Sequence, residues 1–258
     1  MTAPARPREF EFELPVGYED GDGQVHRTAV LRKMTGRDEA VLADRRHRAN
    51  GARMISELLG NCLVRLGTLE APGIRAAQGL YSADRQFLLI RLREITFGAQ
   101  MQASYACGVC HESTILIEDL SELEVVRLGP GEVPGDVTVK LEDGYIDRSG
   151  DLYDVLVFRH PTGLDEERVA GAVKENASQG KNALMARCLK EMGDMPRPKL
   201  EALGTAVFKD MTLSDRGLVD RALNTDGPGI DLRRPVSCGG CGREYTASLD
   251  MSNFLAAS

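Results

Sequence analysis

The sequence predicts an α+β fold built by tandem duplication of one unit, a β-hairpin followed by helices and a C-x-x-C turn. Three observations lead to this prediction. Short motifs recur in the same order along the 258 residues. Each set of motifs begins with apolar residues that alternate with charged ones, which is typical of half-buried strands. Each set ends with a cysteine pair, and we expect the two pairs to form one four-cysteine zinc ribbon on a pseudo-twofold axis.

The repeated motifs keep nearly constant spacing between the two parts of the chain. TGRDE at Thr35–Glu39 returns as TGLDE at Thr162–Glu166. One such match carries little weight, but several in one order indicate a real repeat. The further matches are Gly17-Tyr18 with Gly144-Tyr145, Cys62 with Cys188, Asp84-Arg85 with Asp215-Arg216, and CGVC with CGGC.

The boundary between the predicted copies lies in LGPGEVPGD, residues 128–136, whose glycines, prolines and acidic residues suit an exposed linker. Residues 9–127 are then the first copy, with its hairpin, helices and CGVC turn. Residues 137–258 are the second, with the CGGC turn. Residues 1–8 are predicted to be a polar N-terminal tail.

Each copy is predicted to open with a β-hairpin. In the first copy Phe10, Phe12 and Leu14 alternate with glutamates, a Gly/Asp-rich turn follows, and residues 28–31 return. The same alternation begins at Val137 in the second copy. Both turns fall at matching positions, so each hairpin prediction supports the other.

Helices are predicted to follow each hairpin. Thr35 and Thr162 precede an aspartate by three residues, the spacing at which a side chain caps the first turn of a helix. Apolar residues at helical spacing then predict two more helices in each copy, the later one capped by Ser82 or Thr212. These helices are Met54–Leu66 and Ser82–Glu94 in the first copy, and Ala183–Met192 and Thr212–Leu223 in the second.

The cysteine pairs are the most informative chemistry in the sequence. A C-x-x-C turn supplies two thiolates, which is half of a tetrahedral zinc site. Cys107 and Cys110 provide one half, and Cys238 and Cys241 provide the other. We therefore expect these four residues to bind one structural zinc ion that joins the two copies.

Other roles for these residues fit the sequence less well. A redox dithiol of the thioredoxin type requires the cysteine pair at a helix N-terminus in a βαβ unit, and neither pair has that context. His111 follows Cys110 but corresponds to Gly242, so we expect a solvated histidine. Cys62 and Cys188 lie on apolar helix faces and are predicted to be small buried hydrophobic residues.

The charge of the chain argues against nucleic-acid binding. The net charge is -7, and both halves are acidic, whereas phosphate-binding proteins gain affinity from basic surfaces. Arg233, Arg234 and Arg243 lie near the second cysteine pair, but the first pair has no comparable group. We interpret them as a solvated cluster. A zinc-ribbon regulator that binds nucleic acid stays open as an alternative.

The sequence contains no recognised catalytic or membrane signal. It lacks the nucleophile-elbow, phosphate-loop, metalloprotease and dinucleotide motifs, and four structural thiolates leave no open metal position. We expect no enzyme and no small-molecule substrate, although an enzyme with a site between the copies stays open. The apolar runs are too short to span a membrane and no signal peptide is evident, so a cytoplasmic protein is expected.

Taken together, these motifs resemble those of the T-even phage baseplate protein family. The resemblance is carried by a hairpin leading into RKMTGRDE (Arg32–Glu39) or HPTGLDE (His160–Glu166), the cysteine-containing helix, the ADR or SDR helix start, and the C-x-x-C turn. It covers nearly the whole chain outside the first eight residues. Members of the family are described as baseplate hub assembly proteins, and related chains occur with contractile phage tails, tailocins and contractile injection systems.

The resemblance implies a structural protein or assembly chaperone of a contractile, phage-tail-like particle. Its implied partners are other baseplate, hub or tube proteins. Such a protein would be made in the cytoplasm and incorporated into, or released from, the assembled particle.

Overall fold

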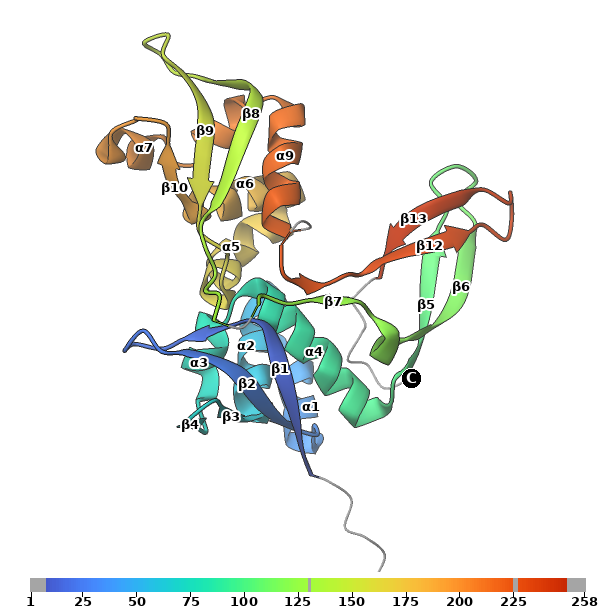
Figure 1. The fold of residues 1–258 in the computed structure, drawn as a ribbon. Coiled ribbons are helices and arrows are strands. Elements are labelled where there is room, and N and C mark those ends of the chain that lie inside the picture. Colours follow the sequence, from blue (N-terminus) through green and yellow to red (C-terminus); the bar gives the residue numbers. More distant parts are fainter. Residues whose placement is uncertain (1–7, 130, 225–226, 250–258) are drawn as a thin grey trace, which may run out of the picture.

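The structure is a computed structural model that describes residues 8–129, 131–224 and 227–249. Strands and helices are mixed throughout, as expected for an α+β protein (Figure 1). The first half contains an antiparallel sheet in the order β1-β2-β3-β4. Its elements are β1 (Glu9–Glu19), β2 (Val25–Arg32), α1 (Gly36–Ala43), η1 (Arg45–Ala49), α2 (Gly51–Cys62), β3 (Leu63–Leu66), β4 (Leu69–Glu70), α3 (Gly73–Gly79), α4 (Ser82–Phe97), β5 (Gln100–Ala106), β6 (Ser113–Asp119), η2 (Leu120–Glu122) and β7 (Val125–Val126).

The second half follows nearly the same order of elements. Its antiparallel sheet has the order β10-β9-β8. The elements are β8 (Val137–Ile146), β9 (Leu152–Phe158), α5 (Gly163–Glu175), α6 (Ala177–Cys188), β10 (Leu189–Met192), α7 (Arg197–Leu203), α8 (Ala206–Asp210), α9 (Leu213–Asn224), β11 (Gly229–Ile230), β12 (Arg233–Ser237) and β13 (Glu244–Ser248).

The two opening hairpins share an irregularity in register. The β1–β2 pairing shifts between Glu13 and Tyr18. The β8–β9 pairing shifts between Lys140 and Tyr145, at the matching position. At the end of each hairpin an aspartate side chain accepts two turn amides: Asp20 from Asp22 and Gln24, and Asp147 from Ser149 and Asp151.

The prediction of helices beyond the cysteines at Cys62 and Cys188 is wrong. Helix α2 ends at Cys62, and residues 63–66 form β3; likewise α6 ends at Cys188, and residues 189–192 form β10. In each case the chain leaves the helix to pair with the return strand of the hairpin, β2 or β9. Backbone pairing across the sheet therefore overrides the apolar spacing that favoured a longer helix.

Three of the four predicted helix caps are found in the structure, whereas α2 and α6 begin earlier than predicted, at Gly51 and Ala177. Thr35 and Thr162 each form a capping box with the aspartate three residues later. Thr212 accepts a hydrogen bond from the Asp215 amide at 3.3 Å. The capping role predicted for Ser82 is wrong, because α4 is preceded by Tyr81 and the Ser82 hydroxyl is buried without a hydrogen-bond partner among the described residues.

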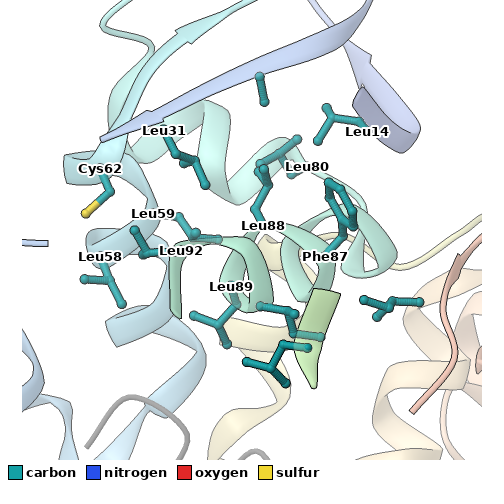
Figure 2. Close-up of a cluster of buried hydrophobic side chains, with 14 of the residues drawn as sticks. Leu14, Leu31, Leu58, Leu59, Cys62, Leu80, Phe87, Leu88, Leu89 and Leu92 are labelled. Carbon is teal, nitrogen blue, oxygen red and sulfur yellow. The ribbon is translucent and has the colours of Figure 1, made fainter. Parts of the chain in front are cut away.

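The buried apolar residues form two clusters. The first lies between the four-stranded sheet and helices α2 and α4, and it includes Leu31, Leu58, Leu59, Phe87 and Leu88 (Figure 2). This cluster also takes residues from the end of the chain: Ile230, Val236 and Leu249. The second cluster lies under the β8-β9-β10 sheet and contains residues of the second half alone.

The two halves contact each other in two places. Helix α5 packs against α2, α3 and α4. Farther along the chain, β11 pairs with β7, and the β12–β13 hairpin lies beside the β5–β6 hairpin (Figure 1). Residues 128–136, the expected linker, contain no helix or strand where they are described. The predicted tail, residues 1–8, lies outside the described residues except for Arg8.

Candidate metal centre

Four cysteine side chains converge where the two hairpins meet. Cys107 and Cys110 belong to the turn between β5 and β6, and Cys238 and Cys241 belong to the turn between β12 and β13. All four Sγ atoms lie within 4.8 Å of one another. Cys107 lies 3.8 Å from Cys241, and Cys110 lies 3.5 Å from Cys238, Sγ to Sγ. The first cysteine of each turn thus faces the second cysteine of the other.

Each turn is built by the same local hydrogen bonds. The Cys107 amide donates to the Glu112 carbonyl, and the Cys238 amide donates to the Arg243 carbonyl, both at 2.9 Å. Each turn then closes on a residue with positive φ, His111 at 62° and Gly242 at 71°. Glycine adopts this left-handed conformation without cost, whereas histidine does so only with strain.

Backbone amides in each turn point at the first cysteine sulfur. The amides of Cys110 and Val109 lower the pKa of the Cys107 thiol to about 6. The amides of Cys241 and Gly240 lower the pKa of Cys238 in the same way. Thiolates are therefore favoured at the two buried positions, Cys107 and Cys238.

The second cysteine of the first turn behaves differently. The Glu112 amide lowers the pKa of Cys110, but the nearby thiols of Cys238, Cys241 and Cys107 raise it, and the net value is about 12. Four sulfurs this close cannot all carry a negative charge without a cation between them. The site thus has the electrostatics of a cation site.

Further contacts join the two hairpins around the cysteines. The Tyr245 hydroxyl donates to the Tyr105 carbonyl at 3.1 Å, and the Gly239 amide donates to Thr114 Oγ1 at 3.2 Å. Arg234 pairs with Glu118 across the hairpins at 3.3 Å. The relative position of the two turns is thus fixed by several bonds besides the sulfurs.

The donor set fits zinc. Zinc with four thiolates is tetrahedral with Zn–S bonds of about 2.3 Å, which places the sulfurs roughly 3.8 Å apart. The Sγ–Sγ separations of 3.5 and 3.8 Å between the two turns are close to that value. They are far longer than a disulfide bond of about 2.05 Å, and the cysteines are free thiols. Four protein sulfurs around a zinc ion would leave no position for a reactive water, as in structural zinc sites.

The remaining cysteines and His111 lie outside this group. His111 is exposed and is not part of the four-residue cluster. Cys62 and Cys188 are fully buried in the two apolar clusters, and burial raises the pKa of each to about 12. Their prediction as buried hydrophobic residues is confirmed.

Two of the three arginines near the second cysteine turn are engaged in ion pairs. Arg233 pairs with Asp231 at 2.8 Å, and Arg234 pairs with Glu118. Arg243 is exposed. The acidic partners of Arg233 and Arg234 reduce the positive potential that a phosphate backbone would meet at those two residues.

A cavity of about 610 Å³ lies between the two halves, where the enzyme alternative would place a site. Two of its charged lining residues, Arg85 and Glu166, pair with each other at 3.0 Å. His160, also in the lining, packs edge-on against Tyr81. Burial lowers the pKa of His160. The contacts of Arg85, Glu166 and His160 thus help to hold the two halves together around this cavity.

Asp84 and Asp215, which lie in the repeated motifs, have a structural role that the sequence did not predict. Asp84 accepts hydrogen bonds from the amides of Val16 and Gly17 at 2.8 and 2.9 Å. Asp215 does the same for the amides of residues 142–144. Both aspartates thus tie a helix to the bulge of its hairpin. The sequence feature that could have predicted these contacts is that both the aspartates and the Gly-Tyr pairs recur in the two halves.

No helix in the described parts of the chain is long and apolar enough to cross a membrane.

The chain belongs to a family of phage structural proteins. The chain matches the family described as T4 bacteriophage base plate protein over residues 8–256, and it belongs to this family. The match extends over nearly the whole chain, as the sequence motifs predicted. No curated protein and no solved structure matches the chain.

Proposed function

We propose that the chain is a structural or assembly protein of the baseplate or hub of a contractile, phage-tail-like particle. The single observation that carries this proposal is the family match over residues 8–256. The site supports it, because a closed set of four thiolates stabilises a fold and does not perform chemistry. Its partners are then other baseplate, hub or tube proteins, and it is made in the cytoplasm before it joins or serves the particle.

We further propose that the chain arose by tandem duplication, with copies at 9–127 and 137–258 and a linker at 128–136. Matching registers, capping boxes and aspartate bridges support this division. The reciprocal approach of the cysteine turns supports a pseudo-twofold axis at that point. Zinc at Cys107, Cys110, Cys238 and Cys241 then links the copies as a structural ion.

The zinc proposal is tested by metal analysis of the purified chain. We expect about one equivalent of zinc per chain, and a large loss in Cys110→Ser. The variant His111→Gly is the matched control, because it alters the same turn without removing a sulfur, and it retains the metal. Less than about half an equivalent in wild-type protein purified without chelator contradicts the zinc site.

The role in assembly is tested by deleting the gene from the genome that encodes it. We expect electron microscopy to find no complete contractile particles, and a plasmid copy to restore them. Mass spectrometry of the restored particles then separates a permanent component, which is present, from a chaperone, which is absent. Normal particles in the deletion strain contradict the proposed function.

A further inference from the structure

Helix α5 of the second half packs on the first half, but the first half makes no equivalent contact with the second in the parts of the chain that the structure describes. Thr162 at the start of α5 forms a bridge with Tyr81, the Ser82 amide donates to the Pro161 carbonyl, and the Gly163 amide donates to the Leu80 carbonyl. Helix α1, the counterpart of α5, packs on α2 and makes no comparable contact with α6, α8 or α9 among the described residues. A contact of this kind leaves one unmatched surface at each end of the molecule.

At the centre of the observed contact is Arg85. It is 2% exposed, and its Nε donates to Glu166 of α5 at 3.0 Å. Its Nη2 donates to the Ala52 carbonyl at the start of α2. Glycine at position 163 leaves room for this guanidinium, because a Cβ on residue 163 would lie 2.3 Å from Arg85 Nη1. A glycine and a glutamate three residues later are thus what this surface receives.

The second half has a matching surface around Arg216, but no segment of the described chain packs on it. Arg216 corresponds to Arg85, and its Nη2 donates to Ser178, at the start of α6, at 3.1 Å. Its Nε is buried and has no hydrogen-bond partner among the described residues, in the place where Arg85 meets Glu166. Leu213, which corresponds to Ser82, is 79% exposed. The surface therefore lacks a carboxylate and an apolar cover.

The segment that would supply both is present at the other end of the molecule. Thr35 begins α1 with the capping box that Thr162 forms in α5. Gly36 corresponds to Gly163, yet a Cβ on Gly36 would meet nothing within 4 Å. Glu39 corresponds to Glu166 and is exposed. The TGRDE segment thus resembles the docked TGLDE segment in its cap, glycine and glutamate, but no surface in the described parts of the chain receives it.

We propose that two copies of the chain associate head to tail, with the start of α1 in one copy docked on the α6–α8–α9 surface of the next. The inference rests on the proposed duplication, since it transfers the α5 contact to the matching surface. Glu39 of one copy then pairs with Arg216 of the other, and Leu213 is covered. Because donor and acceptor lie on different faces, association continues from copy to copy until a ring closes or the ends are capped.

The test is the mass of the full chain in solution, measured by light scattering and sedimentation over a wide range of protein concentration. Wild-type protein is expected to grow in mass with concentration. Gly36→Leu blocks the donor, and Arg216→Glu reverses the charge of the acceptor. Each is expected to weaken self-association roughly 30-fold or more, the effect of breaking a buried charge pair or its close packing. Gly171→Leu, at an α5 position where a Cβ meets nothing within 4 Å, is the matched control and associates like the wild type.

Mixing the two blocked variants gives the decisive result. The Arg216→Glu chain keeps a working donor and the Gly36→Leu chain keeps a working acceptor, so the mixture is expected to form a 1:1 dimer that grows no further. Circular dichroism of each variant shows whether it is folded. A wild type that stays monomeric, association that survives both substitutions, or a mixture that stays monomeric overturns the proposal. None of these outcomes depends on whether the protein serves a baseplate.

Discussion

Asp38 and Asp165 each combine a helix cap with an arginine pair. Asp38 caps α1 and accepts two hydrogen bonds from Arg32, at 2.7 and 3.0 Å. Asp165 caps α5 and accepts two from Arg159, at 2.6 and 2.8 Å. Such two-pronged pairs are among the stronger charged hydrogen bonds. They fasten each hairpin to the helix that follows it.

We predict that Asp165 makes stability depend on acid pH. Burial raises the pKa of Asp165, but its hydrogen bonds with Arg159 and Thr162 outweigh burial and hold the pKa at about 2, below the ordinary 3.8. A carboxyl with a depressed pKa stabilises the folded state above its unfolded pKa, and this contribution is lost as pH falls through the folded pKa. The free-energy gap between wild type and Asp165→Asn should shrink by roughly 2 kcal/mol from pH 5 to pH 2.

The measurement is denaturant unfolding of both proteins at several pH values in this range. Asp194→Asn, which alters an exposed carboxyl, is the control and should follow the wild type throughout. A gap between wild type and Asp165→Asn that stays constant as pH falls would show that the arginine pair does not stabilise the charged form.

At the residue scale the sequence predicted the caps but not their partners. The Thr-x-x-Asp spacing is local, so it predicted both helix starts. The pairing with Arg32 and Arg159 was visible only as an arginine six residues before each aspartate, a spacing that no regular element explains. Ser82 misled the prediction because its hydroxyl is buried beside the second half, and residues far away in sequence determine that burial.

Among the elements, α2 and α6 differ in how closely a neighbouring helix approaches them. In α2 a Cβ on Gly60 would lie 2.7 Å from the Ile74 amide nitrogen at the start of α3. The matching residue in α6 is Ala186. The first half has thus used a glycine to bring α3 against α2.

We predict that Gly60→Ala destabilises the chain by about 1–3 kcal/mol, because the new methyl group overlaps backbone atoms that cannot move aside cheaply. Gly171→Ala is the control, since Gly171 also lies within a helix and its Cβ would meet nothing within 4 Å. That change should stabilise the chain by about 0.5–1 kcal/mol through the higher helix propensity of alanine. Thermal or denaturant unfolding measures both, and a Gly60→Ala protein as stable as the wild type would refute the close approach.

The sequence predicted most elements but not the ends of the cysteine-containing helices. Apolar spacing continues unbroken from α2 into β3 and from α6 into β10, so the local pattern favours one long helix. The helix ends because the next residues pair with the return strand of the hairpin. That strand lies more than thirty residues earlier in the sequence. The short helices α3, α7 and α8 carried no clear local signal.

For the whole molecule, convergence of the cysteine turns was predictable and the helical contact was not. Two half-sites for zinc need each other, so chemistry alone predicted that they meet. The packing of α5 on the first half depends on Arg85, Glu166 and Gly163. These residues belong to the repeated TG-x-DE and ADR motifs, but the motifs do not show which copies of them meet across the two halves. The zinc ion itself and the pseudo-twofold axis stay predictions.

We predict that removing the metal loosens the meeting of the hairpins more than it unfolds either sheet. After chelation, amide hydrogen exchange should speed up in β5, β6, β12 and β13, while β1, β2, β8 and β9 stay protected, because the latter strands are held by the helices packed on their sheets as well as by the apolar clusters. Restoring zinc should restore protection. Equal exchange with and without chelator would show that the hydrogen bonds between Tyr245, Tyr105, Gly239 and Thr114 hold the hairpins without metal.

The first apolar cluster has a consequence for synthesis on the ribosome. Three of its members, Ile230, Val236 and Leu249, are translated after the helices of the second half. The N-terminal half therefore emerges with its interior incomplete, and it reaches its final packing only once these later residues have followed.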